Sequence, residues 1–227
     1  MNKQEERIKY FFNKRIKMQG RKNFSSEIGK NDSAFMILNY LRKNIDIRKK
    51  ILDAGCGEGR FSKYFIEKGA DITSMDFSEE YVKLAKKNIR KGKFVLGSVT
   101  NIPFPDNYFD YIFSVDVLQH VPELKKAISE FHRVLKKGGV LIIIDKNKLG
   151  LHKKYLIPNI LVQKYKEMAE WRYSGFKEQW FMPKKLKKII DEKFGNSRYK
   201  YLTEKNKNKI FTKISQLNLY VVWIAKK

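Results

Sequence analysis

Apolar residues recur along the chain at two spacings, and the two spacings predict strands that alternate with helices. Short apolar runs such as Phe109–Val115 and Val140–Ile144 are typical of strands buried on both faces of a parallel sheet. Between these runs, apolar residues recur every three or four positions, as on a helix that packs one face on a sheet. This alternation favours an α/β fold with right-handed crossovers. The first strand is expected where a short apolar run ends with Ile51 and Leu52. Further strands are expected over 71–75, 93–97, 109–115, 140–144, 198–203 and 217–225.

Local signals set the expected ends of the helices. Ser78 is a typical N-cap residue, and Pro183 suits the first turn of a helix. The pair Gly138-Gly139 is expected to end the helix that starts near Leu124. Helices are expected over 2–18, from Asp32 or Ser33 past Leu41, over 61–69, after Ser78 with a buried stripe of Tyr81, Leu84, Ala85 and Ile89, from Leu124, and over 184–194.

The stretch 49–62, KKILDAGCGEGRFS, combines the end of a strand, a glycine-rich loop and the start of a helix. Asp53 follows the apolar run, and Gly55, Gly57 and Gly59 come next, where the chain must turn sharply and approach a ligand closely. Strand, glycine loop and helix form the first crossover of a nucleotide-binding α/β domain. Asp76 ends the second expected strand, where an acidic residue can hold the two hydroxyls of a ribose.

At these residues the chain resembles the class I S-adenosylmethionine-dependent methyltransferases, in particular the group that methylates small molecules. The resemblance rests on Asp-Ala-Gly-Cys-Gly-Glu-Gly at 53–59 and on four later stretches, and it covers 49–145. It implies a mostly parallel, seven-stranded, doubly wound sheet with its last strand antiparallel, N-terminal helices and a helical lid insertion. It also implies S-adenosylmethionine as the cofactor; no metal ligands are predicted.

By this resemblance, the loop and the ends of the first strands bind the cofactor. Gly55 and Gly57 line its methionine end, and Asp53 helps to orient the ammonium group directly or through water. Asp76 takes the ribose hydroxyls, although a carboxylate at that place can also cap the following helix. Cys56, between the two glycines, is counted with the cofactor-binding residues as a small filler of the loop and not as a nucleophile.

The adenine end is expected near the third strand. Ser98 stands where the family carries an acid, and its hydroxyl can accept a hydrogen bond from the adenine amino group without charge assistance. The backbone N–H of Val99 could read the ring in addition. Phe77 is expected either to lie against the adenine face or to pack in the core.

Residues 114–121, Ser-Val-Asp-Val-Leu-Gln-His-Val, end the fourth strand and are expected to face the methyl group that is transferred. Ser114 and Val115 are predicted to contact the cofactor. Methyl transfer mainly requires alignment of the acceptor and exclusion of water, and a base is needed only if the acceptor must lose a proton. His120, with an ordinary pKa of about 6.5, is the first candidate base and otherwise lines the pocket; Asp116 is the second.

A single domain over 1–227 is expected. It comprises N-terminal helices (1–48), which cover the site or pack on the sheet, and the cofactor-binding core (49–145). The basic and aromatic stretch 146–182 is too long for an ordinary loop and is expected to form a lid, and 183–227 carries the last helix and the strand pair.

The net charge of +25 is unevenly distributed, because 51–145 is nearly neutral and the flanks carry the excess. The flanks either form a basic surface for an anionic partner or reflect lysine-rich composition, since lysine outnumbers arginine 39 to 10. Cys56 is the only cysteine, no apolar run approaches the roughly 20 residues that span a bilayer, and the N-terminus carries no apolar signal segment. A cytoplasmic protein without a transmembrane segment is therefore expected, and its oligomeric state is left open.

Three functions fit the sequence. The first is methyl transfer to a small or medium-sized acceptor, with an anionic acceptor as one variant. The second is RNA methylation, for which basic flanks with interleaved aromatic residues would bind single strands; against one subclass, 114–117 does not resemble the Asn-Pro-Pro-Tyr type of segment. The third is binding of S-adenosylmethionine without catalysis.

Overall fold

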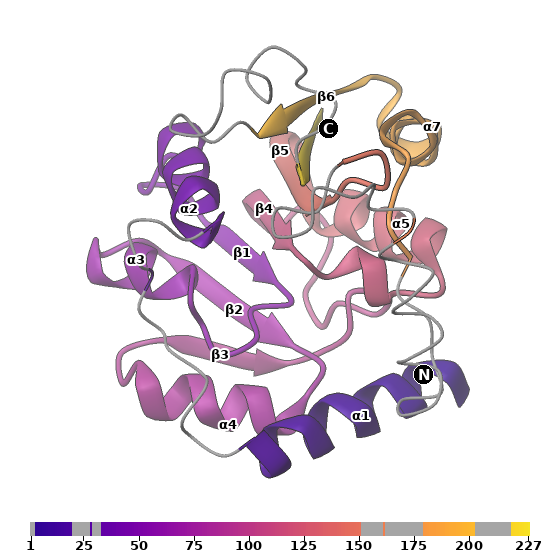
Figure 1. Cartoon of the computed structure of the whole chain (residues 1–227). Coiled ribbons are helices and arrows are strands. Elements are labelled where there is room, and N and C mark those ends of the chain that lie inside the picture. Colours follow the sequence, from indigo (N-terminus) through magenta and orange to yellow (C-terminus); the bar gives the residue numbers. More distant parts are fainter. Residues whose placement is uncertain (1–2, 20–27, 29–32, 151–160, 162–178, 203–218) are drawn as a thin grey trace, which may run out of the picture.

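The computed structural model describes residues 3–19, 28, 33–150, 161, 179–202 and 219–227 of the chain (Figure 1). Its seven strands form one sheet and are β1 (Ile51–Ala54), β2 (Ile72–Asp76), β3 (Lys93–Leu96), β4 (Phe109–Val115), β5 (Leu135–Lys146), β6 (Ser197–Leu202) and β7 (Tyr220–Lys226). The order across the sheet is β3-β2-β1-β4-β5-β7-β6. Strands β1 to β5 pair in parallel, whereas β7 is antiparallel to β5 and to β6. The predicted fold class is confirmed, including the antiparallel last strand.

Helices cover both faces of this sheet, and the described ones are α1 (Lys3–Gln19), α2 (Ser33–Asn44), α3 (Ser62–Glu67), α4 (Glu79–Asn88), the 3₁₀ helix η2 (Leu118–His120), α5 (Leu124–Val134) and α7 (Pro183–Phe194). Side chains alternate along a strand, so β5 serves both faces. Leu141 and Ile143 join the core under α5 and α7, whereas Ile142 and Ile144 join the core under α2 and α3. None of the helices in the described ranges is both long and apolar enough to cross a membrane.

The predicted helix starts are confirmed, and one helix end is wrong. Ser78 Oγ accepts a hydrogen bond from the Tyr81 N–H at 3.2 Å, and Pro183 occupies the first turn of α7. Helix α5 ends at Val134, before the glycine pair that was expected to end it. Gly138 and Gly139 lie inside β5 instead, because both bond to the backbone of Lys227, with the Gly138 N–H donating to its carbonyl oxygen at 2.6 Å.

The buried stripe of α4 differs from the prediction in its first turn. Ala85 and Ile89 are buried as predicted, but Val82 is the buried residue of the first turn. Tyr81 and Leu84 are only half-buried, and Tyr81 lines the cavity described below. The helix therefore presents one edge to β2 and β3 and the other to a functional site.

The predicted lid lies mostly outside the described residues, since 151–160 and 162–178 are not among them. At its end, Trp180 and Phe181 are buried. Phe181 forms an isolated parallel bridge with Asn147, and the Lys148 N–H donates to the Phe181 carbonyl oxygen at 2.9 Å. The two ends of the expected lid are thus joined at the carboxyl end of β5.

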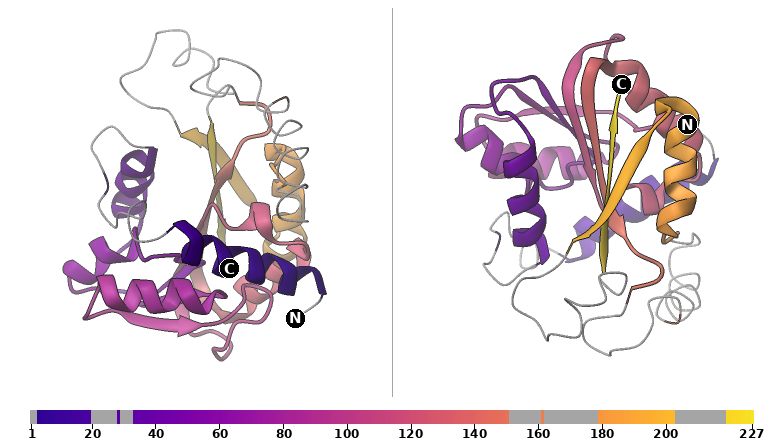
Figure 2. Two further views of the ribbon diagram at one scale, coloured as in Figure 1. Left: turned by 60° about the horizontal axis from the view of Figure 1, so that its bottom comes forward. Right: turned by 90° about the horizontal axis from the view of Figure 1, so that it is seen from above.

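Helix α1 lies across the carboxyl-end edge of the sheet, beside α4 (Figures 1 and 2). Lys9 Nζ lies 2.9 Å from Glu79 Oε1, and Ser78 Oγ donates to Asn13 Oδ1 at 2.6 Å. Both contacts join α1 to the first residues of α4, directly after β2. This docking places the inner side of α1 over the strand ends where ligands bind in parallel sheets.

Candidate functional site

A cavity of about 390 Å³ lies at the carboxyl ends of β1, β2, β3 and β4 and is closed on one side by α1. This volume is within the range of about 300–1,000 Å³ typical of small-molecule sites. Ten of the predicted site residues line it: Gly55, Cys56, Gly57, Asp76, Phe77, Ser98, Val99, Val115, Asp116 and His120. The switch in strand order between β1 and β4 coincides with the site, as it does in other doubly wound sheets.

The glycine loop after β1 turns back toward β2. The N–H groups of Gly55 and Cys56 both donate to the Met75 carbonyl oxygen, at 2.7 and 2.9 Å. Gly55 has φ +90°, and a Cβ there would lie 2.3 Å from Val117 Cγ2, so only glycine fits. Cys56 is buried, and burial raises the pKa of its thiol well above the ordinary value. The thiol is therefore neutral, as expected of a small filler.

Asp76 closes the loop from the end of β2. Its Oδ2 accepts from the Gly57 N–H at 2.8 Å, and its Oδ1 accepts from the Ser78 N–H at 2.9 Å. Asp76 is 6% exposed and lines the cavity, and burial raises the pKa of its carboxyl to about 6. Asp76 therefore caps the turn into α4, which is one of the two roles expected of it, and the residue also lines the cavity.

Two predicted residues do not reach the cavity. Asp53 is 1% exposed, and its Oδ2 accepts from Ser62 Oγ at 2.5 Å, which in turn accepts from Ser74 Oγ at 2.7 Å. Burial raises the pKa of Asp53 to about 7. Ser114 is likewise buried at 1% exposure and is absent from the lining. Each is the penultimate residue of its strand, so its side chain enters the interior, and any effect on a ligand passes through neighbouring residues.

The end of β4 supplies the opposite wall. Asp116 has φ +57°, and Tyr220 Oη donates to its Oδ2 at 3.1 Å. Asp145 is fully buried close by, and burial, followed by the charge of Asp116, raises its pKa well above the ordinary value. His120 ends η2, with its ring centroid 5.1 Å from that of Phe12 in an edge-to-face arrangement. The two candidate bases thus lie on one wall, away from Asp76.

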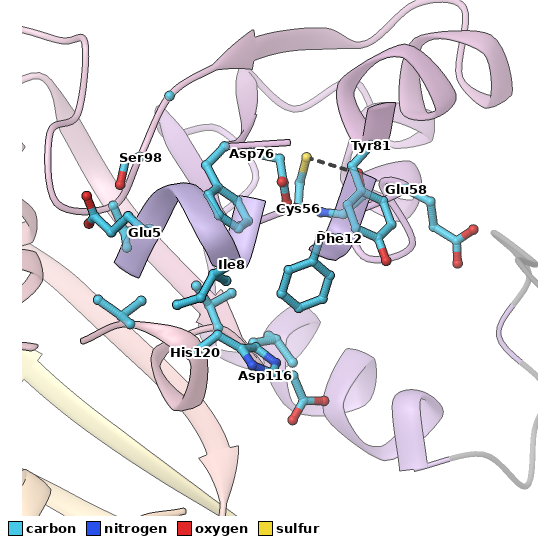
Figure 3. A pocket seen from close by; sticks show the side chains of 18 of the residues that line it. Glu5, Ile8, Phe12, Cys56, Glu58, Asp76, Tyr81, Ser98, Asp116 and His120 are labelled. Carbon is cyan, nitrogen blue, oxygen red and sulfur yellow. Dashed lines mark hydrogen bonds between the residues drawn. The ribbon is translucent and has the colours of Figure 1, made fainter. Parts of the chain in front are cut away.

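Helix α1 contributes residues that were not predicted. Glu5, Ile8 and Phe12 lie one helical turn apart and project into the cavity, as Figure 3 shows. The Phe12 ring packs edge-on against Phe77 at 5.9 Å between centroids and also contacts His120. A helix was predicted over 2–18, but no local signal in its sequence separates a face that packs on a sheet from one that lines a cavity. Other lining residues that were not predicted include Glu58, Arg60, Phe61, Tyr81 and Val117.

The lining is acidic, in contrast to the chain as a whole. Four carboxyl-bearing side chains, those of Glu5, Glu58, Asp76 and Asp116, line the cavity together with one permanent cation, Arg60. Arg60 lies 3.9 Å from Glu58 and partly offsets its charge. Within the described ranges, no three His, Cys, Asp or Glu side chains are grouped as metal ligands. The electrostatic character suits a ligand with a positive charge.

Several known proteins resemble part of the chain. Residues 52–143 match the protein family described as methyltransferase domain. The chain is 40% identical over 98 residues to a malonyl-[acyl-carrier protein] O-methyltransferase of Hamiltonella defensa, covering 43% of this chain and 38% of that protein. It is 32% identical over 158 residues to an uncharacterized protein of Methanocaldococcus jannaschii, covering 68% of this chain and 65% of that one. The matches to several curated methyltransferases span only 30–38% of their length.

Solved structures share the fold over nearly the whole chain. A SAM-dependent methyltransferase of Thermotoga maritima, described as a possible histamine N-methyltransferase, superposes with a TM-score of 0.71 at 18% identity, covering 96% of this chain and 99% of that one. The [4+2]-cyclase SpnF superposes with a TM-score of 0.63 at 17% identity, covering 90% and 85%. Because a cyclase shares it, the fold does not define the reaction.

Proposed function

Through residues 52–143 the chain belongs to the class I, Rossmann-like S-adenosylmethionine-dependent methyltransferases, and on this premise we propose that it transfers a methyl group to a small or medium-sized acceptor. S-adenosylmethionine is the cofactor that this family and fold imply. When bound, it supplies a methyl group already activated by a positively charged sulfonium. The curated relatives with which this chain shares part of its length methylate malonyl-[acyl-carrier protein] or demethylmenaquinone, according to their names.

The residues of the cavity fit this cofactor. The Asp76 carboxylate is a suitable acceptor for two ribose hydroxyls, and the Gly57 N–H holds it in place at 2.8 Å. Gly55 and Gly57 leave room for close approach of the methionine end. The acidic lining favours the sulfonium over the neutral thioether that remains after transfer. A basic, phosphate-binding loop is not required, because the cofactor has no pyrophosphate.

On the acceptor side, we assign His120 and Asp116 to the wall that faces the transferred methyl group. Their task is to align the acceptor and, where its nucleophile carries a proton, to accept that proton. Tyr220 fixes the orientation of Asp116 by its hydrogen bond, and Phe12 packs against the edge of His120. Ile8 and Phe12 exclude water from this part of the cavity.

The charge of the lining also bears on the acceptor. Because carboxyl groups outnumber cations in the cavity, the reacting end of the acceptor is proposed to be neutral or cationic. An anionic part, if the acceptor has one, would lie outside the cavity, toward the basic flanks of the sequence. Work in the reducing cytoplasm remains part of the proposal, in keeping with the single buried thiol of Cys56.

The buried Asp76 carboxylate at the cavity wall is the observation that carries the proposal. Asp76→Ala should weaken the binding of S-adenosylhomocysteine by about 1.5–3 kcal/mol, the value of a hydrogen bond to a charged group. Isothermal titration calorimetry measures the effect, and melting curves show whether the variant is folded. Asp71→Ala, which removes an exposed carboxylate directly before the same strand, is the matched control. Unchanged affinity in folded Asp76→Ala would contradict the ribose role.

Turnover requires a separate test, since binding alone would also fit a non-catalytic protein. The wild-type chain should transfer a labelled methyl group from S-adenosylmethionine to a component of a small-metabolite fraction. An RNA fraction is tested in parallel, and binding to it that weakens steeply with salt would support the RNA alternative instead. Absence of transfer to every fraction, with intact cofactor binding, would favour the non-catalytic alternative.

A further inference from the structure

Helix α1 carries a buried carboxylate into the cavity. Glu5 is 6% exposed, whereas Glu6, the next residue on the helix, is exposed. Charged side chains are rarely buried to this extent unless they have partners. One partner is Thr100, whose Oγ1 donates to Glu5 Oε1 at 2.6 Å. Thr100 Oγ1 also lies 2.8 Å from Ser98 Oγ, so Glu5 belongs to a polar group at the end of β3.

The position of this group within the cavity indicates which part of the cofactor it meets. Asp76 ends β2, and β3 is the next strand outward in the sheet. A base attached to a ribose at Asp76 would therefore extend toward Ser98 and Val99, between the apolar side chains of Phe77 and Ile8. Figure 3 shows Glu5 beside Ser98 at this end of the cavity, with Ile8 next to them.

Adenine requires a hydrogen-bond acceptor at this end of the cavity. Its exocyclic amino group is a donor, and Ser98 offers only a neutral hydroxyl that already lies 2.8 Å from Thr100. A carboxylate is the stronger acceptor, because a hydrogen bond to an ionised group is about twice as strong as one between neutral groups. Glu5 lines the same cavity and is held in place by Thr100.

We propose that Glu5 of the N-terminal helix accepts the hydrogen bond from the adenine amino group of the cofactor. The proposal rests on the proposed function and adds to it the residue that selects adenine. The hydrogen-bond acceptor for adenine then comes from α1 and not from the loop after β3, which carries the predicted Ser98. Selection of the base depends on the docking of α1 on α4, through Lys9 with Glu79 and Asn13 with Ser78.

The test compares two ligands that differ at this group. S-adenosylhomocysteine carries the amino group, and S-inosylhomocysteine carries a carbonyl oxygen in its place. Wild-type protein should bind the adenine compound more tightly. Glu5→Gln should reduce the ratio of the dissociation constant of S-inosylhomocysteine to that of S-adenosylhomocysteine by about tenfold or more, as expected for loss of one charge-assisted hydrogen bond. Glu5→Leu removes the acceptor altogether and should reduce the ratio at least as far.

Glu6→Gln is the matched control, since it makes the same charge change at an exposed position of the same helix and should leave the ratio unchanged. Melting curves identify which Glu5 variant is folded, and the ratio is measured on that one. A wild-type ratio retained in a folded Glu5 variant would overturn the assignment of Glu5. Failure of wild-type protein to bind S-adenosylhomocysteine at all would instead contradict the proposed function.

Discussion

Gly55→Ala tests whether the glycine loop and the end of β4 are in contact as tightly as the structure indicates. An alanine Cβ at this position would lie 2.3 Å from Val117 Cγ2 and 3.0 Å from its Cγ1. Overpacking of this kind costs about 1–3 kcal/mol. The φ of +90° adds about 1–2 kcal/mol for any residue with a side chain. The free energy of unfolding should therefore fall by about 2–5 kcal/mol in total.

Gly69→Ala separates the two contributions. Gly69 has φ +76°, but nothing lies within 4 Å of the Cβ that alanine would add, so only the backbone cost of about 1–2 kcal/mol applies. Both variants are measured by urea denaturation. Adding Val117→Ala to Gly55→Ala should recover the steric part of the loss and leave the backbone part. Equal destabilisation by Gly55→Ala and Gly69→Ala, or no recovery in the double variant, would refute the reasoning.

Three further predictions concern the cavity. If the His120 ring accepts a proton, His120→Ala should lower kcat by about 100-fold or more, with little change in cofactor affinity. His132→Ala, on α5 outside the cavity, should leave kcat unchanged, and full activity of His120→Ala would exclude His120 as a base. Burial raises the pKa of Asp76 to about 6, and ribose hydroxyls favour its ionised form, so the affinity for S-adenosylhomocysteine should be constant above pH 6 and fall by up to about tenfold per pH unit below it. Calorimetry from acid to neutral pH measures this, and an affinity that rises as the pH falls would contradict it. S-adenosylhomocysteine should slow amide hydrogen exchange in α1 more than in α2, since only α1 lines the cavity; equal changes in both helices would argue against that placement.

Strand positions could be predicted from the sequence because they follow local pattern. The fourth strand, β4, has the predicted bounds Phe109–Val115. The fifth extends beyond the predicted Val140–Ile144, because Leu135 pairs with Phe109 and the glycine pair bonds to Lys227, contacts between residues distant in sequence. Apolar periodicity carries no information about such partners.

The site residues also divide into those that local sequence predicts and those that depend on distant contacts. Residues at a strand end, such as Asp76, or just beyond one, such as Ser98, were predicted because the sheet itself brings strand ends together. Asp53 and Ser114 stand one residue earlier, where side-chain alternation directs them into the interior. Glu5 could not be predicted at all, since an acid in the first turn of a helix is ordinary there and its burial depends on where that helix docks.

The position of α1 determines how a ligand gains access to the cavity. One helix lines the cavity through Glu5, Ile8 and Phe12, and Phe12 packs against the His120 ring. A movement of α1 would therefore open the proposed adenine end of the cavity and the wall that carries His120 at the same time. Loosening of the Lys9 and Asn13 contacts should therefore speed both the binding and the release of the cofactor.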